Sequence, residues 1–404
     1  MSTSTTTEIP APANTDKIVC KIDGALVHAV PNHIRDNHAE EWTVARYQAE
    51  FPGEPLLSEY AKWMLAKARA QKEAAGAAAA AGGHLAEAVD LKKPMWEVFG
   101  FGKTNKACLN ARGEPVMVEV KGGLDADAQS FVPDIDERYV FDIDLTKQCI
   151  AARVLNMPLY LYGMHGTGKS SLAEQVNARL NQPQIRVQHT INTEESHITG
   201  QWTVKDGETV FSYGPLPMAM IEGWTYIADE YDFGAPSVLA VYQAVLEGKP
   251  LVIKEAPPEL RIVRPHPNFR FIGTGNTSGG GDETGLYQGT QMQNAANFSR
   301  FGMTIEVGYM TPALEATVIA GQAGIDKTDA AKLVEYAVEV RKAFKAGTLS
   351  TTISPRELIN AAKVGLAFGR NFRLGIDLAF AKRLNKVDGE ACKAYAQRAF
   401  GGAA

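Results

Sequence analysis

Gly163-Met164-His165-Gly166-Thr167-Gly168-Lys169-Ser170-Ser171 fits the phosphate-binding pattern G-x-x-x-x-G-K-S/T. Before it, residues 158–162 form a short apolar, aromatic segment that is typical of a buried strand. After it, residues 169–180 carry apolar side chains at helical spacing. The sequence therefore predicts a strand, a glycine loop and a helix in that order, which is the arrangement that phosphate binding needs.

The residue types in this loop suit an anionic ligand. Glycines let the backbone turn sharply and direct several N–H groups onto one anion, and the helix N-terminus adds partial positive charge. We expect Lys169 to reach the β- and γ-phosphates of a nucleotide and the Ser170 hydroxyl to ligate Mg²⁺. The predicted nucleotide contacts within the loop are Gly163, His165, Gly166, Thr167, Gly168, Lys169, Ser170 and Ser171.

Composition narrows the class of protein. A chain of 404 residues has room for two or three domains, and a net charge of −5 argues neither for nor against nucleic acid. The four cysteines are scattered without any C-x-x-C, which fits a reducing compartment. No apolar run is long enough to span a membrane, and the N-terminus lacks the features of a signal peptide. We therefore expect a cytoplasmic protein.

Two adjacent carboxylates, Asp229 and Glu230, end a second apolar segment, residues 224–228. In a P-loop ATPase such a strand end places Asp229 against the Mg²⁺ shell and leaves Glu230 to orient and deprotonate the attacking water. Taken alone, an acidic turn after a strand explains the pair equally well. The phosphate loop earlier in the chain favours the catalytic interpretation.

Polar residues elsewhere extend this pattern. Asn276 ends a further apolar segment, residues 269–275, where its amide could hold the lytic water; the alternative is a turn-initiating asparagine. The glycine-rich loop 278–290 that follows is expected to leave Leu286 and Tyr287 exposed or half exposed. Ser354-Pro355-Arg356-Glu357 has the cap, proline and acidic residue of a helix start, which would carry Arg356 towards the nucleotide.

The N-terminal part has a pattern of its own. Four residues follow the spacing C-x2-C-x9-H-x4-H of a zinc finger, except that aspartate replaces the second cysteine: Cys20, Asp23, His33 and His38. One interpretation is a zinc site with either Asp23 or His28 completing the ligands. The other is a degenerate finger held together by apolar packing alone. The aromatic-rich residues after it indicate one or two helices over a small core, with a partner-binding face as the alternative.

These patterns predict an α/β fold: a doubly wound parallel sheet with the nucleotide at the strand carboxyl ends, an all-α C-terminal lid and a small N-terminal module. Hairpins are expected within 198–213 and 251–263. The expected segments are a disordered tail 1–15, a finger-like module 16–66, an Ala/Gly-rich linker 67–93, an irregular pre-core piece 94–131, the α/β core 132–310 and the helical lid 311–404.

Residues from about 132 to 400 resemble the AAA+ ATPases, and within them the group that contains MoxR ATPases, the magnesium-chelatase I subunit and, most similar, the S subunit of aerobic cobaltochelatase. The stretches that carry the resemblance, besides the loop, are Val132-Pro133-Asp134-Ile135-Asp136, Asp229-Glu230-Tyr231-Asp232, Arg264-Pro265-His266-Pro267, Thr284-Gly285-Leu286-Tyr287-Gln288-Gly289-Thr290-Gln291 and Ser354-Pro355-Arg356. Residues 1–93 have no counterpart in the chelatase subunit.

The resemblance implies roles for single residues. Lys169 and Ser170 would be Walker A, Asp229 and Glu230 Walker B, Asn276 sensor 1, Arg356 sensor 2, and Arg300 the arginine finger that completes a neighbour's site. It also implies a homo-oligomeric ring, expected to be a hexamer, with the hairpins facing its pore. Ser299 precedes Arg300 where the family usually has aspartate, so the finger is the least secure of these assignments.

The expected activity is Mg²⁺-dependent ATP hydrolysis that remodels a partner. Three uses compete: metal insertion into a corrin-type macrocycle together with an adhesion-site-containing co-subunit, MoxR-type remodelling of another protein client, and a nucleic-acid-binding ring. The third is weakest because no basic stripe with interleaved aromatic residues is present.

Overall fold

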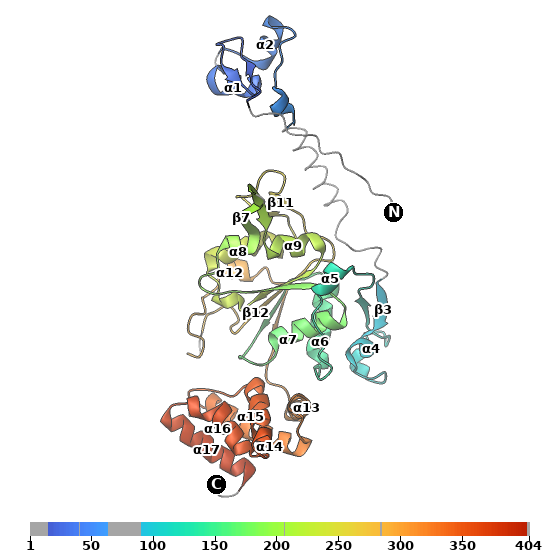
Figure 1. Ribbon diagram of the computed structural model, residues 1–404. Helices are drawn as coiled ribbons and strands as arrows, with labels where there is room; N and C mark the ends of the chain where they lie inside the picture. The colour runs from blue at the N-terminus through green and yellow to red at the C-terminus, as the bar shows by residue number, and fades with distance from the viewer. Residues whose placement is uncertain (1–14, 40, 64–89, 206, 283–284, 402–404) are drawn as a thin grey trace. The chain divides into compact units, whose positions relative to one another are not determined.

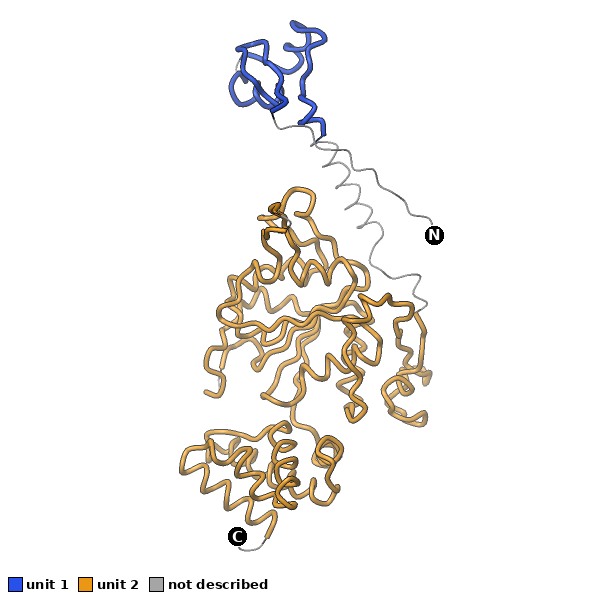
Figure 2. Tube along the Cα trace, viewed as in Figure 1, with its two compact units in different colours: residues 1–81 blue, residues 82–404 orange. Residues whose placement is uncertain are grey.

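A computed structural model describes residues 15–39, 41–63, 90–205, 207–282 and 285–401 (Figure 1). The chain divides into two compact units, residues 1–81 and 82–404 (Figure 2). Residues 1–14 of the predicted tail and residues 67–89 of the predicted linker lie outside the described residues. No helix within the described ranges is long and apolar enough to cross a membrane.

A five-stranded parallel sheet organises the second unit. Its strand order is β13-β5-β12-β9-β6. The bounds are β5 Leu159–Tyr162, β6 Gln184–Gln188, β9 Thr225–Asp229, β12 Arg270–Gly275 and β13 Met303–Glu306. Every neighbouring pair is parallel, so all five carboxyl ends meet at one edge. This confirms the predicted parallel sheet.

Helices cover both faces of this sheet. Figure 1 shows α6 (Ile143–Val154) and α7 (Lys169–Arg179) on one face, and α8 (Glu195–Thr199) and α9 (Pro215–Glu222) on the other. Side chains alternate along β9 because successive strand residues point to opposite faces: Tyr226 packs in the α9 cluster and Ile227 in the α7 cluster. The sheet is therefore buried on both sides, as a doubly wound fold requires.

Two hairpins extend from this unit, as predicted. The first joins β7 (Gly200–Lys205) to β8 (Glu208–Tyr213), and the second joins β10 (Leu251–Val252) to β11 (Ile262–Val263). The other short elements of this region are η2 Tyr231–Phe233, α10 Pro236–Leu239, η3 Ala240–Tyr242, α11 Gln243–Leu246 and α12 Ala295–Phe298.

The stretch before the sheet is more ordered than predicted. β3 (Leu91–Pro94) pairs antiparallel with β4 (Met117–Val120), so the last residues assigned to the linker belong to a strand. The following residues were wrongly expected to be irregular: they form α4 Met95–Phe99, η1 Lys106–Cys108 and α5 Ala126–Ser130. Met95 and Phe99 are buried in the same cluster as β5, and this packing anchors the stretch to the core.

In the described part of the C-terminal region, residues 311–401, all regular secondary structure is helical, as predicted. It comprises α13 Pro312–Ala323, α14 Lys327–Lys345, α15 Pro355–Ala367, α16 Phe372–Ala379, η4 Ala381–Arg383 and α17 Lys386–Phe400. These helices share an apolar core of their own. A buried ion pair, in which Arg341 donates through both terminal nitrogens to Glu315 at 2.7 Å each, ties α14 to α13.

The N-terminal unit is small. β1 (Ile18–Val19) pairs with β2 (Leu26–Val27), and α1 (Val30–Asn37) and α2 (Val44–Glu50) follow. The buried apolar residues of its described part are Cys20, Val30, Ile34 and Tyr47. α2 lies in the aromatic-rich segment, where one or two helices over a small core were expected.

Candidate nucleotide site

The glycine loop lies between β5 and α7 at the carboxyl edge of the sheet. Gly163 has φ 145°, and a Cβ there would lie 2.4 Å from the carbonyl oxygen of Val307. Gly166 has φ 68°, and a Cβ there would lie 2.7 Å from the Ser354 side chain. A side chain at either position would collide with these groups, so the two glycines bring the loop against the residue after β13 on one side and the lid on the other.

A cavity of about 760 Å³ lies between this loop and the lid. Such a volume is within the range of small-molecule sites. Its lining includes five of the predicted site residues, namely Gly166, Thr167, Gly168, Ser171 and Arg356. Asp136, from the Val-Pro-Asp-Ile-Asp stretch, and Lys363 of α15 also line it. Loop, pre-loop segment and lid helix thus enclose a common space.

Lys169 lies at the centre of the site. Its ammonium donates to the carbonyl oxygens of Gly163 (2.8 Å) and Met164 (3.0 Å) and to Oδ1 of Asn276 (3.0 Å). Burial lowers the pKa of Lys169 to about 8, although the neighbouring carboxylates act in the opposite direction. The side chain is therefore held by weak, neutral acceptors that a phosphate can replace.

Asp229, the last residue of β9, connects three elements. Its Oδ1 accepts from Ser170 (2.7 Å) and from Thr274 of β12, while Oδ2 accepts from Arg186 of β6. These three side-chain donors outweigh burial and lower the pKa of Asp229, so the carboxylate stays ionised.

The oxygens of Ser170 and Asp229 suit Mg²⁺. Adjacent ligands of an octahedron with bonds of ~2.1 Å lie roughly 3 Å apart, and these two oxygens are 2.7 Å apart. Both are hard oxygen donors of the kind that Mg²⁺ prefers. The pair predicted from the sequence therefore fits the ion.

Glu230 has a strained backbone, with φ 52° in the left-handed region that glycine normally occupies. Its Oε2 accepts from Nδ2 of Asn276 at 2.8 Å, and the same amide accepts from Lys169 through Oδ1. Burial, followed by Asp229 and Asp232, raises the pKa of Glu230. A carboxylate with raised pKa in a fixed position is the usual form of a general base.

Two residues of this network were not singled out by sequence reasoning. Asp232 accepts from the backbone nitrogens of Asn276 (2.8 Å) and Thr277 (2.9 Å), which fixes the tip of β12. Arg186 holds Asp229 from the neighbouring strand. The sequence carried a signal for Asp232, since it stands in the Tyr-Asp pair directly after Glu230, but none for Arg186.

Tyr287 corrects an expectation about the glycine-rich loop. It is buried, with 9% of its surface exposed, rather than exposed or half exposed. Its hydroxyl accepts from the backbone nitrogen of His165 at 2.9 Å. Tyr287 therefore supports the phosphate loop, whereas Leu286 is half-buried as expected.

The start of α15 lies against the phosphate loop. Ser354 and Glu357 form a capping box at the predicted helix start, which places Arg356 on the cavity wall. Glu357 also forms an ion pair with Arg383 and lies 4.0 Å from His165. Burial, followed by the positive charge of Lys169, lowers the pKa of His165, which favours the neutral ring.

Arg300 lies outside the cavity lining. It directly follows Ser299, the C-cap of α12, and its Nε donates to Glu247 at 2.6 Å. The structure thus gathers Lys169, Ser170, Asp229, Glu230 and Asn276 into one network, places Arg356 beside it and keeps Arg300 apart. In the other unit, Cys20, Asp23 and His33 come together.

Parallel sheet, phosphate loop and paired carboxylates define a P-loop ATPase. Residues 158–291 match the AAA domain of the dynein-related subfamily, and residues 315–391 match the C-terminal region of CbbQ, NirQ and NorQ proteins.

Individual relatives support this class of protein. Aerobic cobaltochelatase subunit CobS of a Sinorhizobium species is 38% identical over 67% of this chain and 84% of its own length. Protein NorQ of Paracoccus denitrificans is 25% identical over 66% and 92%. The chain therefore belongs to the MoxR-like AAA ATPases, the family of CobS and NorQ, and is an ATP-hydrolysing enzyme.

Among solved structures, the RuvB Holliday junction branch migration motor of Thermotoga maritima is similar to this chain at 13% identity and a TM-score of 0.37, covering 61% of this chain and 73% of that one. The order and direction of the strands define the fold.

Proposed function

We propose that this ATPase works as a ring of identical subunits and uses hydrolysis to remodel a protein partner, as a CobS-like motor that drives metal insertion into a corrin-type macrocycle. The observation that carries the proposal is the Lys169–Asn276–Glu230 chain of hydrogen bonds at the sheet edge. The 38% identity to CobS supports the particular use.

The roles follow from the contacts. Glu230 orients and deprotonates the attacking water, and Asn276 fixes both Glu230 and the ammonium of Lys169. Lys169 leaves its carbonyl partners to contact the phosphates, and Arg356 reaches them from the lid. Mg²⁺, held by Ser170 and Asp229, would neutralise the phosphate charge when it is bound.

Arg300 supplies the missing transition-state charge to a neighbouring subunit in this proposal. Arg300 lies outside the nucleotide cavity of its own subunit. This position supports a role in a neighbouring subunit, because an arginine finger that acts in trans enters the site of the next subunit. Its ion pair with Glu247 holds the side chain in a defined position near the end of α12.

The hairpins offer a surface for a partner. Trp202 and Val204 on the first hairpin are 49% and 76% exposed, and Val252 and Ile262 on the second are 52% and 58% exposed. Trp202 donates to the carbonyl oxygen of Glu255, which links the two hairpins. Exposed apolar side chains on a linked pair of hairpins support contact with a protein client.

A second candidate is MoxR-type remodelling of a different protein. The C-terminal match to CbbQ, NirQ and NorQ proteins and the similarity to NorQ favour it. The two candidates share the ATPase site and differ in the client alone.

Glu230→Gln separates the candidates. The variant should bind ATP normally and hydrolyse it about 10²–10⁴-fold more slowly, since only the base is lost. Glu335→Gln, on the exposed side of α14, is the control and should hydrolyse normally. A tagged Glu230→Gln chain is then used with ATP to capture partners that mass spectrometry identifies. A chelatase large subunit supports the first candidate, and its repeated absence from a cell that expresses it contradicts that candidate.

A further inference from the structure

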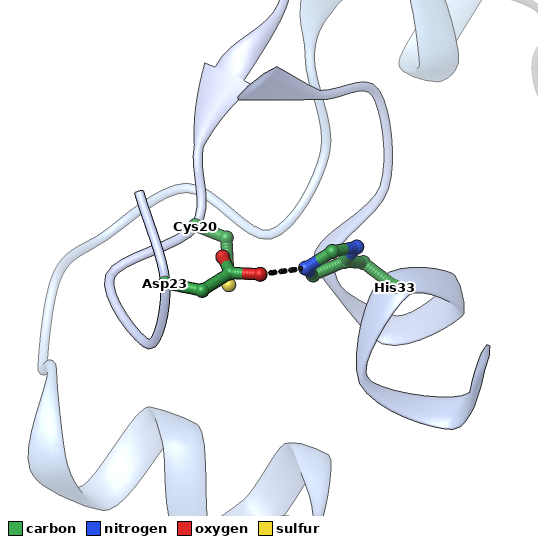
Figure 3. Close-up of side chains that lie close together, drawn as sticks. All are labelled: Cys20, Asp23 and His33. Atoms are coloured by element: carbon green, nitrogen blue, oxygen red, sulfur yellow. Dashed lines mark hydrogen bonds and ion pairs between the residues drawn. The ribbon is translucent and has the colours of Figure 1, made fainter. Parts of the chain in front are cut away.

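The N-terminal unit brings together side chains that serve no part of the ATPase site. Cys20 and Asp23 lie at the turn between β1 and β2, and His33 lies in α1. One ligand atom from each lies within 4.8 Å of the other two (Figure 3). We propose that Cys20, Asp23, His33 and His38 form a structural zinc site, independent of nucleotide.

Aspartate takes the place of the second cysteine in the geometry as well as in the sequence. Oδ2 of Asp23 lies 2.7 Å from Nε2 of His33 and 3.2 Å from Nε2 of His38, which is the C-cap of α1. Ligands around tetrahedral zinc lie about 3.3–3.8 Å apart, given bonds of ~2.0–2.3 Å. The two Asp23–histidine distances are shorter than this range, so the carboxylate and both rings would move apart by less than about 1 Å to admit the ion.

His28, the alternative ligand, makes other contacts. Its Nδ1 lies 2.9 Å from the Ser58 hydroxyl, and its ring packs against Tyr60 with centroids 5.0 Å apart. It thus belongs to the contact between the β2 end and residues 58–60. The contacts therefore favour Asp23 over His28 in the proposed site.

The surroundings hold the ligands in place. Oδ1 of Asp23 accepts from the backbone nitrogen of Ala25, so Oδ2 is directed at the histidines. Nδ1 of His33 lies 3.0 Å from the side-chain amide of Asn37, one turn further along α1. Nδ2 of the same amide donates to the carbonyl oxygen of His33 at 3.2 Å, so Asn37 holds both the ring and the backbone of this residue.

The small size of the N-terminal unit explains why bound zinc would stabilise its fold. The core of its described part has four buried apolar residues, one of them the ligand Cys20. Small domains with cores of this size usually need metals or disulfides. No disulfide is available, because Cys20 is a free thiol and the other cysteines lie in the second unit. Thiolate and imidazole ligands select zinc over Mg²⁺ or Ca²⁺.

Metal analysis of the full chain tests the site. We expect about one zinc per chain after purification with zinc and dialysis, and the same content for His28→Ala. Asp23→Ala and His33→Ala should lose nearly all of it while keeping ATP hydrolysis, which reports that the second unit remains folded. Wild-type protein without zinc, or Asp23→Ala or His33→Ala protein that keeps it, would overturn the proposal.

The absorption spectrum of Co²⁺ bound to the wild-type chain provides a second test, which does not depend on a destabilised variant. Co²⁺ bound in this site should show tetrahedral absorption bands together with a thiolate charge-transfer band. Asp23→Cys should strengthen that charge-transfer band and tighten binding, since it adds a second thiolate. His38→Ala should weaken binding by at least about tenfold. Octahedral bands, or a spectrum that Asp23→Cys leaves unchanged, would contradict the ligand set.

Discussion

The two polar clusters of this molecule are built in different ways. In the nucleotide site, Asp229, Asn276 and Lys169 come from segments far apart in the chain, which the parallel sheet brings to one edge. In the N-terminal cluster, Cys20 to His38 span a single turn and helix. The first depends on the tertiary fold, whereas the second can form locally around an ion. Loss of either cluster should therefore leave the other intact.

The largest expected effect is the loss of ATP binding without any loss of zinc. Lys169→Ala should abolish measurable ATP binding, because the phosphates lose their nearest buried cation. Zinc content should stay at the wild-type value. Calorimetric titration with ATP and metal analysis of the same sample provide the two readouts, with Lys332→Ala on α14 as an exposed control. Unchanged ATP affinity would refute the P-loop assignment.

A smaller effect follows from the lowered pKa of Lys169. The protonated side chain favours the anionic phosphates, so affinity is full below about pH 8 and falls as the pH rises through that pKa. The slope should reach at most about tenfold per pH unit, since one proton is linked to binding. ATP dissociation constants from about pH 7.5 to 9.5 measure it. A flat profile would mean that Lys169 titrates like an exposed lysine.

The smallest expected effect comes from the hydrogen bond between Tyr287 and His165, which supports the phosphate loop. Tyr287→Phe removes the hydroxyl that accepts from the His165 backbone, which should cost about 1 kcal/mol and weaken ATP binding about fivefold. Tyr395→Phe in α17, distant in sequence and packed against Arg398, serves as a control with no change expected. Identical affinities for the two variants would show that the loop holds its shape without Tyr287.

Sequence patterns predicted some contacts of this molecule and missed others, and each outcome has a physical reason. Asp229 and Asn276 could be placed together because the ends of parallel strands meet at one edge. The β3–β4 pair could not, because Lys92 and Lys93 are charged and their partners lie far along the chain. Tyr287 looked exposed among glycines, and only the packing of its loop on the phosphate loop shows otherwise.

The central claim is that one subunit's arginine completes the next subunit's site. Arg300→Ala and Glu230→Gln should each bind ATP and each be nearly inactive. Mixed in equal amounts, with co-assembly verified by a tag on one variant, they should recover roughly a quarter of wild-type hydrolysis, the fraction of interfaces with both residues intact in a random ring. A co-assembled mixture that stays inactive would contradict the claim, as would an Arg300→Ala chain that hydrolyses ATP at the wild-type rate.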